Sequence, residues 1–327
     1  MKKQTIIFFI LGLLISCNNI DFKPKYIDFE NAWESENLIG KVKTLEQSKA
    51  KVNNFKTGEK DRPLIEFKKE FTENGNISYE EHYGDSGQIN SFIKNEYNKN
   101  GQRIKSTSKY LLIPLNSTVT SEFNTPGKLI SASIYQNDTL DEKAILEYDS
   151  SGKLKTKTSI RNTDTTTGKY EYKYNENGKI LWKKQTETIN NNRHESFIWF
   201  KYDQNGNLIE LLNKAVSDIG LLGELYKTIP DYEIKTTYEY DRKNRIKKTI
   251  KYKSGKIEEE KEFDKFYNQT LVKFYVSGAL NREMKYEYEF DNKGNWIERN
   301  VFLKQDFGQD KNWILIFVET RKIVYYK

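Results

Sequence analysis

The chain has 327 residues and a formal net charge of +7, with 36% hydrophobic, 31% charged and 14% aromatic residues. That aromatic content argues against a disordered chain. The single cysteine excludes an intrachain disulfide and a cysteine-based zinc cluster, and two histidines argue against a histidine-rich metal site. The sequence contains neither a GxSxG motif nor a glycine-rich phosphate loop. We therefore expect a protein that is not an enzyme and that holds no cofactor.

Residues 1–16 have the composition of a secretory signal peptide. Two lysines precede an apolar run over residues 6–15, which is too short to span a bilayer. The run ends in Leu-Ile-Ser-Cys at residues 14–17, which resembles a bacterial lipobox. The resemblance implies cleavage before Cys17, lipidation of its thiol and attachment to a membrane through acyl chains. No aspartate follows Cys17, so the inner-membrane retention signal is absent and the outer membrane is favoured.

The segment that follows the lipobox divides into two parts. Residues 17–27 are polar and are predicted to be a tether. Residues 28–63 lack the motif that dominates the rest of the chain, and their apolar residues indicate a short helix that leads into a strand around residues 38–45. Because terminal repeats expose an unpaired edge, we interpret residues 28–63 as an N-terminal cap on the first edge.

Residues 64–327 are dominated by a repeated seven-residue motif. It reads aromatic, Asp or Asn, two variable residues, Gly, a polar residue and an apolar residue. The Asp or Asn side chain bonds its own backbone in a turn, and Gly supplies a positive φ, so the motif predicts hairpin turns. Clear copies occupy residues 71–77, 83–89, 97–103, 123–129, 148–154, 174–180, 202–208 and 290–296, and weaker copies occupy 240–246, 252–257 and 275–280.

The residues between the motifs alternate as half-buried strands do. Tyr170, Tyr172 and Tyr174 alternate with Glu171 and Lys173. The spacing gives one strand and one turn for about every 13 residues, hence about 18–20 strands in a long antiparallel meander. An open sheet of more than about ten strands curls. We therefore predict an all-β fold, curled into a spiral or a partly closed barrel.

The repeat resembles the tyrosine-aspartate (YD, or Rhs) repeats, and the resemblance covers residues 64–327. Its most specific copy is Tyr-Glu-Tyr-Glu-Phe-Asp-Asn-Lys-Gly-Asn-Trp at residues 286–296, followed by a closing strand at 321–326. Larger members of that family form shells around a payload. This chain lacks their size and their autoproteolytic C-terminal core, so the resemblance does not imply an encapsulating role.

Residues 213–230 interrupt the spacing of the repeats. They fit either two further strands or an inserted helix or loop, and Pro230 argues against a central strand. If the segment is an insertion, Leu221, Leu222 and Tyr226 are predicted to cover an open end of the barrel. A ligand or a partner would then bind there, because specificity in a repeat protein belongs to its irregular connections.

Two further features bear on function. Trp182, Trp199, Trp296 and Trp313 either fill the curled interior or stack on sugars. Lysines alternate with glutamates along the strands, which argues against a nucleic-acid partner. The hypothesis is a non-enzymatic, lipid-anchored protein of the cell envelope that acts as a scaffold for binding a protein or glycan. The alternatives are a dedicated glycan-binding surface lipoprotein and an enzyme without a recognisable motif.

Overall fold

The computed structural model describes residues 32–54, 58–161, 164–189, 192–218, 232–307 and 310–327. The predicted signal peptide, the predicted tether and Cys17 lie outside the described residues. In chain order the elements are α2 (Ala32–Ser35), β1 (Val42–Asn54), β2 (Glu59–Lys60), β3 (Leu64–Phe71), β4 (Ile77–Tyr83), β5 (Ile89–Tyr97), β6 (Arg103–Tyr110), β7 (Leu115–Phe123), β8 (Leu129–Gln136), β9 (Thr139–Tyr148), β10 (Leu154–Arg161), β11 (Asp164–Tyr174), β12 (Ile180–Ile189), β13 (Asn192–Tyr202), β14 (Leu208–Asp218), β15 (Tyr232–Tyr240), β16 (Ile246–Lys253), β17 (Lys256–Phe263), β18 (Gln269–Val276), β19 (Ala279–Phe290), β20 (Trp296–Phe307) and β21 (Asp310–Tyr325).

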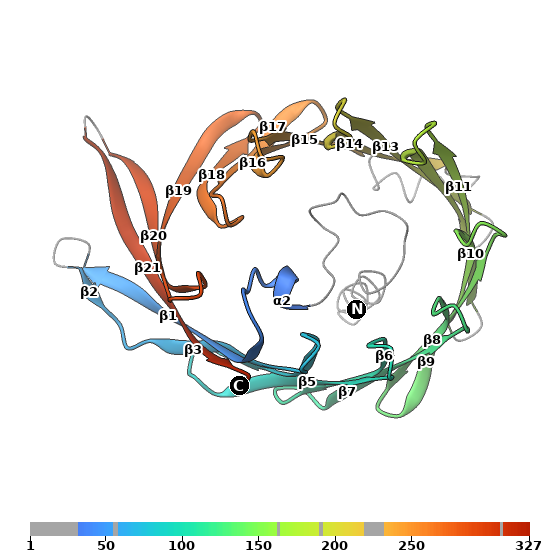
Figure 1. Cartoon of the computed structure of the whole chain (residues 1–327), viewed down its shortest axis with the longest axis horizontal. Coiled ribbons are helices and arrows are strands. Elements are labelled where there is room, and N and C mark those ends of the chain that lie inside the picture. Colours follow the sequence, from blue (N-terminus) through green and yellow to red (C-terminus); the bar gives the residue numbers. More distant parts are fainter. Residues whose placement is uncertain (1–31, 55–57, 162–163, 190–191, 219–231, 308–309) are drawn as a thin grey trace.

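The strands form a closed antiparallel barrel, as Figure 1 shows in a view along its axis. From β3 to β21 each strand pairs with the next, so the predicted meander is confirmed. Strand β1 pairs with β3 on one side and with β21 on the other. Among the described residues, 20 of the 21 strands therefore belong to the ring, and β2 pairs with β1 alone. The sheet is all-β and curled as expected, and it closes completely.

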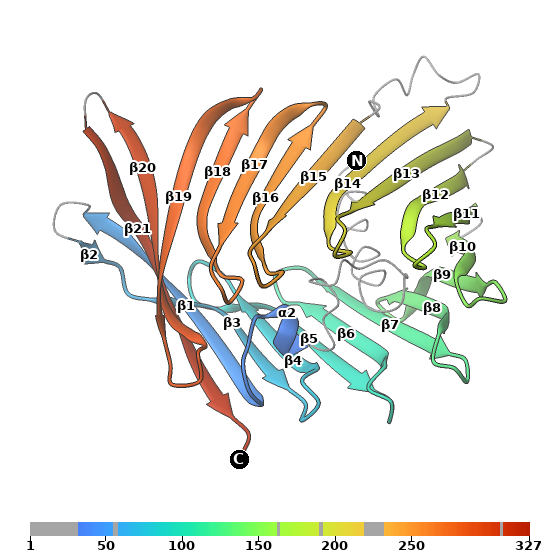
Figure 2. The same cartoon turned by 45° about the horizontal axis from the view of Figure 1, so that its top comes forward.

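The N-terminal segment contributes a strand to this ring. The short helix and the following strand predicted before residue 64 are present as α2 and β1. Strand β1 covers the edge of the first strand of the repeat region by pairing with it, and it pairs with the last strand as well, so that neither of them is left unpaired. Figure 2 shows β1 between β3 and β21 along the barrel wall.

Seven of the eight clear copies and the weaker copy at 240–246 form the same turn along one end of the barrel. The copy at 83–89 forms this turn at the opposite end, where the copies at 252–257 and 275–280 are two-residue hairpin turns instead. In the copy at residues 174–180, Asn175 Oδ1 accepts hydrogen bonds from the backbone N–H groups of Asn177 (3.0 Å) and Lys179 (2.8 Å). Gly178 has a φ of +75°. The adjoining pairing shifts by one residue, which is the β-bulge expected after such a turn. The turns along the first end are here called the motif turns, and the connections at the opposite end vary more in length.

Neighbouring motif turns are also bonded to one another. The residue after the motif glycine donates its side chain to the carbonyl of the next motif glycine: Gln102 donates to Gly127 (2.6 Å), and Lys128 donates to Gly152. The motif tyrosines add a second link, since Tyr97 donates to the carbonyl of Ile77 at 2.7 Å. These lateral contacts explain why the motif requires a polar residue after glycine and an aromatic residue at its start.

One further copy of the motif turn is not recognisable in the sequence. Residues 263–269 form the same turn, in which Asp264 Oδ1 accepts from the backbone N–H groups of Phe266 (2.7 Å) and Asn268 (2.9 Å). Tyr267 stands where most copies have glycine and the copy at 240–246 has Asn244, and its φ is +64°. A large residue is uncommon in this conformation, which is why the copy is not visible in the sequence.

Residues 213–230 are only partly described. Strand β14 continues to Asp218 and pairs directly with β15, with Ala215 opposite Tyr232. Residues 219–231, which include Leu221, Leu222 and Tyr226, lie outside the described residues. The predicted binding role of these three side chains therefore stays a prediction.

The position of α2 identifies the inner face of the wall. Figure 1 shows α2 inside the ring, where Trp33 and Leu38 pack with Leu45, Phe71 and their neighbours. Side chains alternate along each strand, and the pairing register carries that alternation from strand to strand. The second core cluster, formed by Ile180, Phe200 and Leu208, falls on the same inner face.

The motif turns allow a direct test of the glycine position. Gly178 has nothing within 4 Å of an added β-carbon, so Gly178→Ala is expected to cost about 1–2 kcal/mol through its left-handed φ alone. Tyr267→Gly, at the equivalent position, is expected to gain up to about 1 kcal/mol. Urea unfolding measures both changes, with the exposed neighbour Glu176→Ala as a near-neutral control. A Gly178→Ala protein as stable as the wild type would contradict this account.

Candidate binding surfaces of the barrel

The outer face of the wall carries charged side chains in ion pairs. Glu260 is 8% exposed, and its Oε1 lies 3.1 Å from both Lys248 on β16 and Lys273 on β18. Glu283 and Lys304 form another outer pair at 2.6 Å. Further outer pairs are Lys68–Glu46, Lys105–Glu96, Lys184–Glu195 and Lys214–Glu233. A wall in contact with lipid has an apolar band on its outer face, and these strands place charges there instead.

Two of the tryptophans singled out in the sequence lie together on this outer face. Trp182 on β12 is directly opposite Trp199 on β13, and both are half-buried. Phe197 stacks on Trp199, with ring centroids 5.3 Å apart and an angle of 13° between the rings. Leu212 on β14 is opposite Trp199 and extends the apolar area. This tryptophan pair faces away from the interior, whereas Trp296 is 4% exposed and belongs to the inner wall.

The inner face of β11 and β12 holds a buried lysine among tyrosines. Lys183 is 7% exposed, lies opposite Tyr172, and has its Nζ 4.9 Å from the ring centroid of Tyr170. Among the described residues it forms no ion pair, and burial lowers its pKa to about 8. Burial together with the charge of Glu187 raises the pKa of Tyr170 to about 12. The hydroxyl of Tyr174 is buried without a hydrogen-bond partner on the same face.

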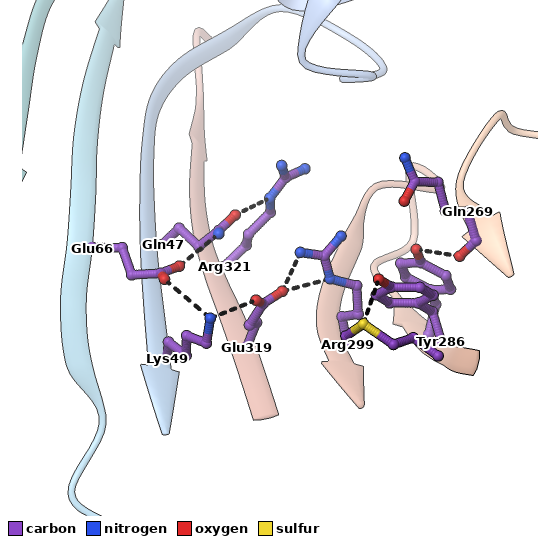
Figure 3. Close-up of polar contacts among 10 residues, drawn as sticks. Gln47, Lys49, Glu66, Gln269, Tyr286, Arg299, Glu319 and Arg321 are labelled. Carbon is purple, nitrogen blue, oxygen red and sulfur yellow. Dashed lines mark hydrogen bonds and ion pairs between the residues drawn. The ribbon is translucent and has the colours of Figure 1, made fainter. Parts of the chain in front are cut away.

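A second inner cluster joins β1, β20 and β21, and Figure 3 shows its charged side chains. We call it the arginine cluster; it consists of Lys49, Trp296, Arg299, Glu319 and Arg321. Glu319 is 6% exposed and accepts from Arg299 through Nε (2.5 Å) and NH2. Lys49 lies 3.7 Å from the other oxygen of Glu319 and 3.7 Å from Glu66. Arg299 is therefore paired with a carboxylate.

Arg321 is held differently from Arg299. Its Nε donates to Gln47 Oε1 at 3.1 Å, and its guanidinium carbon lies 3.7 Å from the ring centroid of Trp296. Its NH1 nitrogen is buried without a hydrogen-bond partner. Burial, reinforced by the positive charge of Arg299, lowers the pKa of Arg321 to about 10. Burial also opposes the charge of Arg299, but Glu319 outweighs this effect and the pKa of Arg299 is raised.

The sequence did not indicate Lys183, Arg299 or Arg321 as site residues. Each is one of many basic residues that alternate with aromatic or acidic ones, so nothing in the local pattern distinguishes them. The only available signal was the strand period, which places Arg299, Glu319 and Arg321 on one face once the pairing register is known.

The described residues contain no group of three or more His, Cys, Asp and Glu side chains that could hold a metal ion. The two histidines, His82 and His194, lie on separate strands, and His82 Nε2 is 3.2 Å from Glu80. No helix in the described part of the chain is long and apolar enough to cross a membrane.

Comparisons with known proteins show remote likenesses in fold. No family model and no curated protein matches the chain. A porin-like protein from Bacteroides uniformis shares 11% identity over 86% of this chain and 96% of its own, with a TM-score of 0.33. A porin-like protein from Bacteroides vulgatus shares 11% identity over 87% of this chain and 98% of its own, with a TM-score of 0.30. TcdB2-TccC3 without its hypervariable C-terminal region shares 12% identity over 81% of this chain and 18% of its own, with a TM-score of 0.29. Likenesses of this strength do not identify a function.

The buried lysine gives a prediction with a defined pH dependence. Because the folded pKa of Lys183 lies below its unfolded value, the unfolded chain binds more protons between about pH 8 and 10.4. The cost of the buried charge is thus complete below pH 8 and declines as the pH rises through that window. Lys183→Met is expected to raise the free energy of unfolding by about 1–3 kcal/mol at pH 7 and by less at pH 9.5.

Urea unfolding at the two pH values measures this difference. Lys184→Met is the matched control, since Lys184 lies on the outer face and pairs with Glu195 at 2.9 Å. It should lose a few tenths of a kcal/mol and show no gain at pH 7. A Lys183→Met protein that is less stable than the wild type at pH 7 would show that the ammonium has a stabilising partner.

Proposed function

We propose that the protein is a non-enzymatic lipoprotein of the cell envelope, in which an acylated Cys17 anchors a binding barrel that lies outside the bilayer. The observation that carries this proposal is the ion-paired outer face. Charged residues such as Glu260 and Glu283 occupy outward positions within the strands, where a lipid-facing wall would require apolar side chains. A barrel of this kind needs a separate anchor to stay at a membrane, and the lipobox-like sequence at residues 14–17 would supply one.

The barrel itself supports a binding role. Barrels of about 16–18 strands already have interiors wider than their own side chains fill, and this ring has 20 strands among the described residues. Its inner face presents tyrosines, tryptophan and incompletely paired cations, which are groups that bind polar or anionic ligands. The motif turns and their lateral bonds would serve to hold this wall in place.

The anchor can be tested by replacing its attachment site. Cys17→Ala is expected to leave the protein unprocessed or to release it from membranes, because no thiol remains for acylation. Membrane fractionation and labelling with radioactive palmitate measure the two effects. Cys17→Ser, the closest isostere, should behave as Cys17→Ala does. Palmitate incorporation into either variant would contradict the proposal.

A second candidate function, glycan binding, is favoured by the tryptophan pair. Trp182, Trp199 and the stacked Phe197 form an aromatic platform on the outer face, with Lys184 and Glu195 beside it as polar groups. Flat aromatic surfaces of this kind stack on the apolar faces of sugar rings. The platform is only half-buried, so that a sugar could reach it.

The platform can be tested without disturbing the inner wall. Trp199→Ala is expected to abolish binding on a glycan array, since it removes the ring that both Trp182 and Phe197 adjoin. Trp313→Ala is the matched control, because Trp313 is another half-buried tryptophan on the outer face but lies on β21. An array on which the wild type binds no glycan, or on which both variants bind as it does, would exclude this function for the platform.

A further inference from the structure

The arginine cluster has a surplus of positive charge on its inner face. Lys49, Arg299 and Arg321 are cationic, whereas Glu66 and Glu319 are the carboxylates that contact them. Both carboxylates are already committed, since Glu319 accepts from Arg299 and approaches Lys49, and Glu66 contacts Lys49 and accepts from Gln47 at 2.9 Å. Arg321 is the member of the cluster without an anionic partner.

A further carboxylate acts on Arg321 through its charge but is paired with another cation. Glu36, which follows α2, contributes a favourable charge to Arg321 but forms its ion pair with Lys69, at 2.5 Å. Lys69 in turn lies 3.3 Å from Glu80. The carboxylates close to Arg321 are therefore engaged by other cations, and its NH1 nitrogen is left buried and without an acceptor. A buried donor in this state carries the full cost of its lost hydration.

The guanidinium of Arg321 is also fixed in orientation. Its face lies on the ring of Trp296, which has Arg299 5.0 Å away as well, and its Nε is held by Gln47. Figure 3 shows the side chains of Arg321 and Arg299 rising side by side from neighbouring strands, with their terminal nitrogens uppermost. Because its Nε is occupied and its plane is fixed, the terminal nitrogens of Arg321 are the donors that remain for a ligand, and a pair of guanidinium nitrogens suits a planar or tetrahedral oxyanion.

We propose that Arg321 is the centre of an anion-binding site on the inner wall, which takes the carboxylate or phosphate group of a small ligand. The ligand's oxygens accept from the terminal nitrogens of Arg321, with Arg299 and Lys49 adding positive charge. The aromatic rings of Trp296 and Tyr286 flank the site, and Arg299 lies 5.5 Å from the ring centroid of Tyr286. This site stands on the inner wall alone and does not depend on the anchor or on the outer tryptophan pair.

Calorimetric titration of the full-length protein, extracted from membranes in detergent, tests the site. The probes are inorganic phosphate and sodium glucuronate, with glucose as the neutral counterpart of glucuronate. Arg321→Met retains the packing of the side chain against Trp296 but removes its charge, and is expected to weaken binding by about tenfold or more. Arg103→Met is the matched control and should bind as the wild type does, since Arg103 lies on the same face in a different sector of the wall.

The two anions distinguish the possible sources. If the protein binds phosphate but not glucuronate, the site takes inorganic phosphate or phosphorylated ligands. If it binds glucuronate but not glucose, the site takes acidic sugars. Either outcome supports the proposal if Arg321→Met abolishes that binding. Binding of neither anion, or binding that survives Arg321→Met, overturns it.

A second measurement covers the case in which Arg321→Met fails to fold. Phenylglyoxal modifies accessible arginines, and mass spectrometry locates the modified positions in the wild-type protein. The probe anion that binds is expected to protect Arg321 and to leave Arg103 unprotected. Equal modification of Arg321 with and without saturating phosphate and glucuronate would overturn the proposal.

Discussion

Closure of the backbone hydrogen-bond ladder is the constraint on which the rest of this structure depends. A sheet of one layer buries only one face of each strand, so it gains little from packing against other elements. Its open edges would also leave rows of unpaired N–H and C=O groups. Strand β1 removes both edges at once by pairing with β3 and β21, with Leu45 opposite Lys69 on one side and Ile323 on the other.

Closure also gives the two faces of the wall different environments. Inward positions around the motif turns carry aromatic and aliphatic side chains, such as Phe71, Tyr97 and Leu208, which pack or bond to the neighbouring hairpin. Outward positions carry ion pairs, each of which contributes only about 0–1 kcal/mol. The inner face and the turns therefore supply most of the stability, and the outer charges keep the surface hydrated.

In two places the inner wall carries a buried charge instead of an aromatic or aliphatic side chain. Lys183 is buried among tyrosines without an ion pair in the described chain, and Arg321 has a terminal nitrogen enclosed without an acceptor. Charges in such surroundings destabilise a fold unless something compensates them. Departures of this kind are where binding sites are expected in a protein whose other features agree with one another. The two clusters lie on well-separated strands, Lys183 on β12 and Arg321 on β21.

The sequence by itself determined the fold class, because its two signals are local. The alternation in residues 170–174 predicts a half-buried strand, and the motif at 174–180 predicts a turn that needs a residue with positive φ. Strands, turns and the antiparallel meander therefore follow without tertiary information. Tyr267 shows the limit of that signal, since the same turn forms where the motif lacks glycine. Only the tertiary structure decided that β1 closes the ring, which tryptophans face outward, and that Arg299, Glu319 and Arg321 meet Lys49. Those facts depend on contacts between residues far apart in the chain, such as Gln47 and Arg321, which are 274 positions apart, and on a register that no local pattern contains.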